Sequence, residues 1–201
     1  MNRLVVGLGS GRCGTKSLHA LLNKQPRSAS IHEPKPLLSY EFDAAMFRAH
    51  WMNLTGWKGT DVVAPIALFY LWYVPAFLSI ESEVCFVCLK RDREETIKSW
   101  MRWTSRREIF THHWTTQGRT YWKNKWGWDV CFPKYDDCPT KEEAIARYYD
   151  HYYRLASVYE EALPNFQIFP MECLNSAQGV REILDFAGFK HPNIVIGIKR
   201  K

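Results

Sequence analysis

A glycine-rich turn near the start of the chain carries residue types that can bind an anion. The segment "RLVVGLGSGRCGTKSL" passes from an apolar run through Gly9 and Gly14 into a stretch with helical character. Backbone N–H groups of such a turn, together with the amino end of the following helix, bind phosphate-like groups. Arg12 adds a cation inside the turn. We therefore expect an anion-binding cradle, built by Ser10, Gly11, Arg12, Cys13, Gly14, Thr15, Lys16 and Ser17.

The position of the lysine separates this turn from the P-loop that binds ATP. The P-loop pattern is G-x-x-x-x-G-K-[ST], in which the lysine directly follows the second glycine. Here Thr15 follows Gly14, and Lys16 comes one residue later. One residue rotates a side chain by ~100° about a helix with about 3.6 residues per turn. The side chain of Lys16 therefore points in another direction than the P-loop lysine and is badly placed to contact a terminal phosphate.

A second segment, "LKRDREETIKSW", also combines a cation with a hydroxyl group. Arg91 follows an apolar run, and Ser99 lies eight residues further on, in a predicted helix. Ligands of open α/β sheets bind at the carboxyl ends of the strands, so we expect Arg91 beside the glycine turn. An arginine fork and a helix hydroxyl hold a phosphate by charge-assisted hydrogen bonds.

The elements that must position these residues alternate between strand and helix. Short apolar runs predict strands at "LVVG", "SASIH", "GTDVVAP", "EVCFVCLKRD" and "FQIFPMECL". Helical periodicity predicts helices at residues 15–24, in "REETIKSWMRW", in "TKEEAIARYYDHYYRLASVYEEAL" and in "SAQGVREILDFAG",. Continuous apolar strands are typical of parallel sheets covered on both faces. The class is therefore α/β, a single domain with a central, mainly parallel sheet flanked by helices.

Three details of this layout can be tested directly. Thr140 and Glu143 have the spacing of a capping box, and Gly188 is expected to stop the last helix,. The run "VVAPIALFYLWYVPAFL" is expected to form a buried helix interrupted by two prolines. Residues 104–139 lack a clear period and are expected to form an irregular insertion or lid.

Length and charge limit the kinds of ligand. Residues 1–201 suit one domain, and a chain of this length buries roughly 70% of its unfolded surface,. The formal net charge of +6 favours anionic ligands, including nucleic acid,. The C-terminal "GIKRK" either approaches the bound phosphates or is a solvated basic tail,.

Compartment and metal use follow from what the sequence lacks. A charged residue follows Met1 closely, and no apolar run is long enough to span a bilayer, so we expect a cytoplasmic protein without a membrane partner,. The six cysteines have no metal-ligand spacing, so no metal is expected,. Cys85 and Cys88 suit packing in a strand, whereas Cys131 and Cys138 could pair in an oxidising compartment,.

The two anion-binding segments, taken in order, resemble the sulfotransferase family, whose members use 3′-phosphoadenosine 5′-phosphosulfate (PAPS). "GSGRCGTKSL" looks like the 5′-phosphosulfate loop of this family, and its "GTKSL" is similar to the G-T-R-A-L of the heparan-type enzymes. Arg12 stands where many members have lysine and others, including the tyrosylprotein type, have arginine. "KRDREETIKSW" resembles the 3′-phosphate element, with Arg91 and Ser99 at the matching places. "REILDFAGF" is similar to the closing helix of the family.

This resemblance implies a P-loop NTPase-like sulfotransferase fold. It also implies an enzyme that transfers a sulfuryl group from PAPS to a hydroxyl acceptor and releases adenosine 3′,5′-bisphosphate (PAP). The loop N–H groups would hold the 5′-phosphate, and Arg12 would neutralise the bridging oxygen as the S–O bond breaks. Arg91 and Ser99 would hold the 3′-phosphate. No γ-phosphate or Mg²⁺ has to be bound. This explains why Lys16 can stand one residue later than the lysine of the P-loop, and it implies that no metal is required.

Sulfuryl transfer also needs a base for the acceptor hydroxyl. The heparan-type enzymes have a catalytic glutamate just after the second strand, and Glu33 in "IHEPKP" resembles it. The cytosolic type uses a histidine at a different strand end, where this sequence has Asp61 in "KGTDVV". His32 is a third candidate. We expect Glu33 to be the base, held in direction by the prolines that follow it.

The sequence does not identify the acceptor, and it also allows two other functions. Residues 36–80 and 104–139 are expected to recognise the acceptor, a saccharide, a lipid-like alcohol, a phenol or a protein tyrosine. The alternative enzyme is a P-loop kinase of small molecules or nucleotides, but no apolar strand ends in an aspartate for magnesium. A basic nucleic-acid-binding module is a further alternative, although the sequence contains no RNA- or DNA-binding motif, so no nucleic-acid partner is expected,.

Overall fold

Five strands form one parallel sheet in the computed structural model, which describes residues 3–54, 59–80, 83–105, 112–116 and 128–197. The strand order is β2-β3-β1-β4-β5. The strands are β1 Arg3–Leu8, β2 Ser28–His32, β3 Val62–Ile66, β4 Val84–Lys90 and β5 Phe166–Pro170. The predicted α/β class with a parallel central sheet is confirmed.

The helices follow the strands along the chain. They are α1 Thr15–Leu22, α2 Ala44–Leu54, α3 Val74–Ile80, α4 Arg93–Thr104, α5 Lys141–Ala162 and α6 Ala177–Phe186. The described residues also form three short 3₁₀ segments: η1 Leu68–Tyr73, η2 Trp128–Cys131 and η3 Met171–Asn175.

The expected helix ends have a clear physical cause. The Thr140 hydroxyl accepts a hydrogen bond from the backbone N–H of Glu143 at 3.2 Å, which caps the start of α5,. Gly188 follows α6 with a φ of 81°, and the N–H of Phe189 donates to the carbonyl of Leu184 at 2.9 Å. This is the left-handed glycine stop that ends many helices. The predicted stop at Gly188 is therefore confirmed, as is the Thr140 cap of the predicted capping box.

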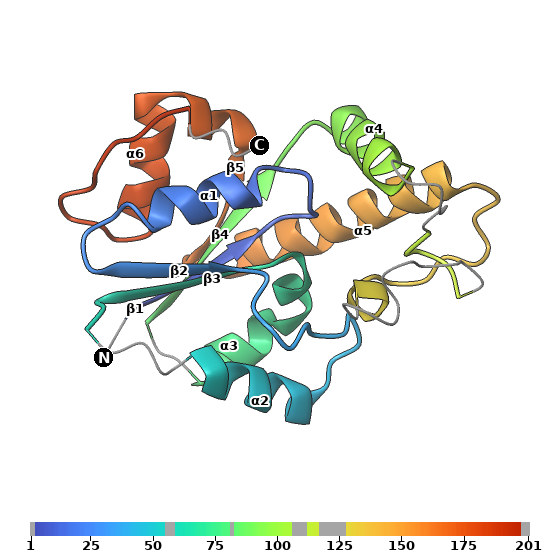
Figure 1. Ribbon diagram of the computed structural model, residues 1–201, viewed down its shortest axis with the longest axis horizontal. Coiled ribbons are helices and arrows are strands. Elements are labelled where there is room, and N and C mark those ends of the chain that lie inside the picture. The colour runs from blue at the N-terminus through green and yellow to red at the C-terminus, as the bar shows by residue number, and fades with distance from the viewer. Residues whose placement is uncertain (1–2, 55–58, 81–82, 106–111, 117–127, 198–201) are drawn as a thin grey trace.

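Both faces of the sheet are buried, as continuous apolar strands require. Leu4, Val6 and Leu8 of β1 face a core shared with α3, α4 and α5. Val5 faces the opposite core, which contains residues of α1 and α6. Figure 1 shows α1 and α6 together on one side of the sheet and α3 and α5 on the other. This alternation fixes the register of the central strand, because a slip by one residue would exchange the two faces.

Strand β1 lies in the middle of the sheet, with β3 on one side and β4 on the other. Its carboxyl end therefore meets the carboxyl ends of both neighbours. Strand β2 is separated from β1 by β3. His32, the last residue of β2, pairs with Ile66 at the end of β3, so the end of β2 still reaches the same edge of the sheet.

The apolar run expected to form one buried helix divides into several elements. Its first part is β3, which includes Pro65, and the remainder forms η1 and α3. The predicted helix is therefore wrong for residues 62–66. Helix α2, within residues 36–80, has no counterpart among the elements expected from the sequence.

The described part of the predicted insertion is irregular but well packed. Trp114 and Phe132 are fully buried, and their rings lie 5.0 Å apart, centroid to centroid. Trp100 of α4 contacts both rings. Residues 106–111 and 117–127 of the proposed lid lie outside the described residues, as do residues 198–201 of the basic tail.

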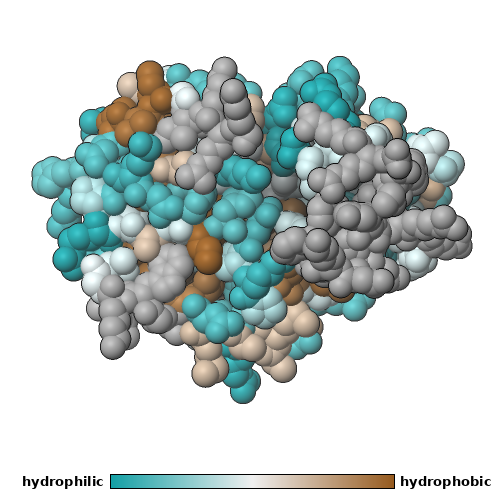
Figure 2. Space-filling model, in the orientation of Figure 1, coloured by the Kyte–Doolittle hydropathy of each residue, from teal (hydrophilic) through white to brown (hydrophobic). Residues whose placement is uncertain are grey.

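The face of the molecule seen in Figure 2 is mostly hydrophilic, with hydrophobic residues at its upper left, on the side where α6 lies. Within the described ranges, no helix combines the length and the apolar character that a bilayer span needs.

Candidate functional site

The glycine turn joins the end of β1 to the start of α1 with a backbone that few side chains allow. Gly11 and Gly14 have φ angles of 79° and 94°, in the left-handed region that favours glycine,. A Cβ atom on Gly11 would lie 2.4 Å from Cζ2 of Trp100. Gly14 occupies the N-cap position of α1 and provides no side-chain cap. The Ser17 N–H donates to the Gly14 carbonyl at 2.9 Å, so the N–H groups of the first two residues of α1 are the ones that favour an anion at this end,.

Two residues of the turn point into the protein. Ser10 and Cys13 are fully buried. The Ser10 Oγ lies 3.2 Å from the Tyr153 hydroxyl, and burial raises the pKa of the Cys13 thiol to about 11. Both side chains pack inside the protein. Ser10 and Cys13 can therefore contact an anion through their backbone groups only.

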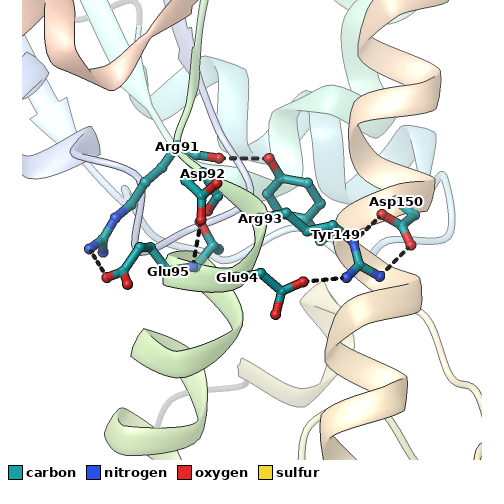
Figure 3. A network of polar contacts seen from close by, with 8 residues as sticks. Arg91, Asp92, Arg93, Glu94, Glu95, Tyr149 and Asp150 are labelled. Carbon is teal, nitrogen blue, oxygen red and sulfur yellow. Dashed lines mark hydrogen bonds and ion pairs between the residues drawn. The ribbon is translucent and has the colours of Figure 1, made fainter.

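The second anion-binding segment lies against the turn. The Arg12 Nε donates to the Ser99 Oγ at 3.1 Å, and an Arg91 Nη1 donates to the Arg12 carbonyl at 3.2 Å. The same guanidinium forms an ion pair with Glu95 at 3.3 Å (Figure 3). The expectation that Arg91 lies beside the glycine turn is therefore confirmed, because β1 and β4 are neighbours in the sheet. Arg12, Arg91 and Ser99 form one cationic group with two guanidinium forks.

A cavity of about 250 Å³ opens beside this group. The glycine turn and the start of α1 form one wall, and Glu33 also lines the cavity. The remaining wall is largely aromatic and includes Trp100, Trp103, Trp128 and Phe132. The arrangement brings cations, a carboxylate and apolar rings together around one space, which is the composition of a small-molecule site.

Glu33 is the carboxylate that the structure brings to the cavity. Its backbone is left-handed, with a φ of 54°, and its N–H donates to the Ile66 carbonyl at 2.8 Å. Non-glycine residues with such a φ are uncommon and often functional. Burial raises the pKa of Glu33 to about 7, whereas Lys16, Lys35 and Arg12 act in the opposite direction. The carboxyl group therefore titrates near neutral pH. Lys16 lines the same cavity, on the side of the carboxylate.

His32 connects Glu33 to the glycine turn. Its Nε2 lies 3.1 Å from the Thr15 hydroxyl, and its Nδ1 lies 3.5 Å from a Glu33 carboxylate oxygen. The imidazole therefore lies between the start of α1 and the carboxylate. This geometry suits a residue that orients Glu33 better than one that contacts an acceptor.

Asp61 lies at the opposite edge of the sheet. It precedes β3, and its backbone carbonyl accepts a hydrogen bond from the N–H of Arg3 at the start of β1. Its exposed carboxylate pairs with Arg27 through two hydrogen bonds of 2.6 and 2.8 Å. The expectation that Asp61 is a candidate base is therefore corrected, because the carboxyl end of β3 is Ile66.

His113 and Asp129 form a pair that sequence reasoning missed. The His113 Nδ1 lies 3.2 Å from an Asp129 carboxylate oxygen, and the buried ring stacks on Phe132 at 5.1 Å. The Nε2 of His113 has no hydrogen-bond partner among the residues that the structure describes, and His113 lines the cavity. Burial lowers the pKa of His113, which favours a neutral ring. No local signal marks this pair, since its members lie sixteen residues apart in a segment without a period.

Among the residues that the structure describes, no group of three or more His, Cys, Asp or Glu residues is placed to hold a metal ion. All six cysteines are free thiols, so Cys131 and Cys138 do not pair. A larger groove of about 830 Å³ lies between α5 and the carboxyl ends of β4 and β5, and Arg91 and Arg93 line it. In this groove the Arg93 guanidinium donates two hydrogen bonds of 2.8 Å to the Asp150 carboxylate. Asp150 therefore offsets part of the positive charge of the groove.

Comparison with known proteins bears on the fold. The sequence matches no protein-family model and no curated protein. A crystal structure of a sulfotransferase from Alicyclobacillus acidocaldarius is similar over 99% of this chain and 87% of that chain, with a TM-score of 0.56 and 17% sequence identity. The fold is sulfotransferase-like. The fold expected from the resemblance of the two anion-binding segments is thus confirmed, and at this identity the likeness concerns the fold alone.

Proposed function

We propose that this protein is a PAPS-dependent sulfotransferase that transfers a sulfuryl group to a hydroxyl acceptor. One observation carries the proposal. In a sulfotransferase-like fold, Arg12, Ser99 and Arg91 converge on the glycine turn, and a carboxylate with a raised pKa lines the adjoining cavity. A cationic group with two guanidinium forks suits a ligand with two phosphate groups, and the carboxylate suits proton removal from an acceptor.

The backbone of the glycine turn supports binding of the 5′-phosphosulfate. A Cβ atom on Gly11 would meet Trp100, and one on Gly14 would lie 3.0 Å from the Met171 side chain, so the turn is closely packed behind its anion-binding side. In the proposal, the first N–H groups of α1 hold the 5′-phosphate, and Arg91 and Ser99 hold the 3′-phosphate. Apolar walls that include Met171 continue from Gly14 in a small cavity of about 80 Å³ that suits the edge of a purine.

Arg12 is the residue best suited to stabilise the leaving group. Its guanidinium contacts Ser99, lies at the mouth of the turn and lines the cavity. During transfer, negative charge develops on the oxygen that bridges sulfur and phosphorus. A fixed cation at that point stabilises the transition state more than the ground state. Lys16 lines the same space and adds positive potential there.

Glu33 completes the reaction as the base. The acceptor oxygen attacks sulfur, the bond from sulfur to the bridging oxygen breaks, and PAP departs with the electron pair of that bond. The proton of the acceptor hydroxyl passes to the Glu33 carboxylate. A carboxyl group with a pKa of about 7 accepts a proton more readily than an ordinary one,. His113 also lines the cavity, and its neutral ring adds to the wall against which the acceptor packs.

The cavity wall favours a flat acceptor. Trp103, Trp128 and Phe132 provide rings on which a sugar face or a phenol can pack,. We therefore propose a small-molecule or glycan acceptor that carries an alcohol or a phenol, and no nucleic-acid partner.

The test is turnover of PAPS in the presence of EDTA. The protein is incubated with PAPS and a panel of phenols, alcohols and saccharides, and PAP is quantified by chromatography. Acceptor-dependent release of PAP supports the proposal. Phosphoryl transfer from ATP that requires Mg²⁺, without any PAP release from PAPS, would establish the kinase alternative instead.

A further inference from the structure

Helix α5 presents three tyrosines to the carboxyl edge of the sheet. Tyr149, Tyr152 and Tyr153 have the spacing i, i+3, i+4, which places them on one face of a helix,. All three side chains are buried. Their hydroxyl groups do not bond to one another; each one reaches a backbone atom at the end of β1 or β4.

Two of these tyrosines hold the start of the glycine turn. The N–H of Gly9 donates to the Tyr152 hydroxyl at 2.9 Å. The N–H of Ser10 donates to the Tyr153 hydroxyl at 3.5 Å. Both contacts are buried, so each hydroxyl satisfies a backbone group that water does not reach,.

The end of β4 is held in the same way. The Tyr153 hydroxyl donates to the Leu89 carbonyl at 2.7 Å, and the Tyr149 hydroxyl donates to the Arg91 carbonyl at 2.6 Å. Figure 3 shows Tyr149 reaching from α5 to the backbone of Arg91, while the Arg91 side chain extends away toward Glu95. Tyr153 thus contacts both strand ends, and Tyr149 contacts the residue proposed to bind the 3′-phosphate.

We propose that Tyr149, Tyr152 and Tyr153 are positioning residues that set the distance between the glycine turn and Arg91. Tyr152 thereby supports the turn that binds the 5′-phosphate, whereas Tyr149 acts through Arg91 and determines the preference for a nucleotide that also carries a 3′-phosphate. This inference rests on the proposed function, because it assumes that the turn and Arg91 bind the two phosphates of one ligand. The hydroxyls act through the backbone and need not contact the nucleotide.

The same helix provides a matched control. Tyr148 is fully buried, and its hydroxyl has no hydrogen-bond partner in the part of the chain that the structure describes. Its ring packs against Phe132 and Trp114. Replacing Tyr148 by phenylalanine removes a buried hydroxyl without removing a contact to either strand end. Tyr149→Phe removes one hydroxyl and one contact to Arg91, so the comparison isolates positioning from packing.

The experiment measures the dissociation constants of PAP and of AMP, which lacks the 3′-phosphate, by calorimetry in EDTA. For Tyr149→Phe we expect the Kd of PAP to rise about tenfold, as for loss of one buried hydrogen bond, and the Kd of AMP to stay unchanged. Tyr152→Phe should weaken both nucleotides equally, because Gly9 belongs to the turn. Tyr148→Phe should leave both constants at the wild-type values. Melting temperatures verify that each variant is folded.

Two results for Tyr149→Phe would overturn this inference. The variant could weaken both nucleotides equally, or it could leave both constants at the values of Tyr148→Phe. Either result would mean that the hydroxyl does not set the preference for the 3′-phosphate. Absence of PAP binding to the wild-type protein would instead overturn the proposed function on which the inference rests, so the two failures are distinguishable.

Discussion

Glu33 unites three features at one residue: a left-handed backbone, a cavity position and a pKa raised to about 7 by burial. Glu33→Gln keeps the shape of the side chain and removes the proton acceptor. We expect turnover to fall by roughly 10²–10⁴, the range for loss of a general base, with PAP affinity unchanged. Single-turnover assays and calorimetry separate the two effects. Glu172→Gln, at an exposed position, serves as the control. Near-normal transfer by Glu33→Gln would refute the base assignment.

The pKa of Glu33 also predicts how stability depends on pH. The ordinary pKa of 4.5 applies to the unfolded chain, and the folded value is about 7. Between these values the unfolded chain releases a proton that the folded protein keeps, so rising pH favours unfolding. Glu33→Gln lacks this effect. We expect its melting temperature to exceed that of the wild type increasingly from pH 4.5 to pH 7. A difference independent of pH would show that Glu33 is not desolvated.

Arg12 is expected to act on charge that develops during transfer. Arg12→Ala should lower kcat by about 10²–10³, the usual size for loss of one such donor, and weaken PAP binding much less. Arg27→Ala is the matched control, since Arg27 is also an exposed, left-handed arginine but pairs with Asp61 at the other edge. Equal and small effects on kcat and on PAP binding would make Arg12 a scaffold residue.

Local motifs predicted the place of some residues in the fold and not of others. The position of Arg91 beside the glycine turn could be predicted, because a short pattern puts Arg91 directly after a strand. The assignment of Asp61 as a candidate base was wrong. The segment "GTDVVAP" does not show that the strand begins at Val62, which leaves Asp61 before the strand and not at its carboxyl end. The pair of His113 and Asp129 and the raised pKa of Glu33 depend on burial by distant segments. Such tertiary effects leave no mark on the local sequence.

At the scale of elements, the glycine turn depends on its contact with α4. Gly11 and Gly59 both have positive φ angles, 79° and 85°. A Cβ atom on Gly11 would lie 2.4 Å from Trp100, whereas one on Gly59 would meet nothing within 4 Å. Both alanine variants suffer the left-handed strain of roughly 1–2 kcal/mol. Gly11→Ala should lose a further ~1–3 kcal/mol through overpacking. Denaturant unfolding measures both, and equal losses would contradict the close packing of the turn on Trp100.

The elements themselves were predictable where the chain has a strong local pattern. The continuous apolar run of β4 and the amphipathic period of α5 identify both elements, and Thr140 marks the helix start. Helix α2 was missed, although Asp43 accepts two hydrogen bonds of 2.9 Å from the backbone at its start. The position of β3 between β1 and β2 is set by long-range pairing, which a local pattern does not encode.

At the scale of the whole molecule, the sheet gathers residues from distant parts of the chain at one edge. The glycine turn follows β1, Glu33 follows β2, and Arg91 follows β4. The formal net charge of +6 supports an anionic ligand at this edge,. Our central claim is that this edge of the sheet binds a nucleotide phosphorylated at the 3′ and 5′ positions without a metal.

The measurement that tests this claim most directly compares thermal stabilisation by PAP in EDTA with stabilisation by ATP and Mg²⁺. A ligand present at about 100 times its Kd stabilises the folded state by ~2.7 kcal/mol. We predict that PAP raises the melting temperature in EDTA and that ATP with Mg²⁺ raises it less. Magnesium-dependent stabilisation by ATP, with none from PAP, would contradict the claim and establish a kinase-like nucleotide site.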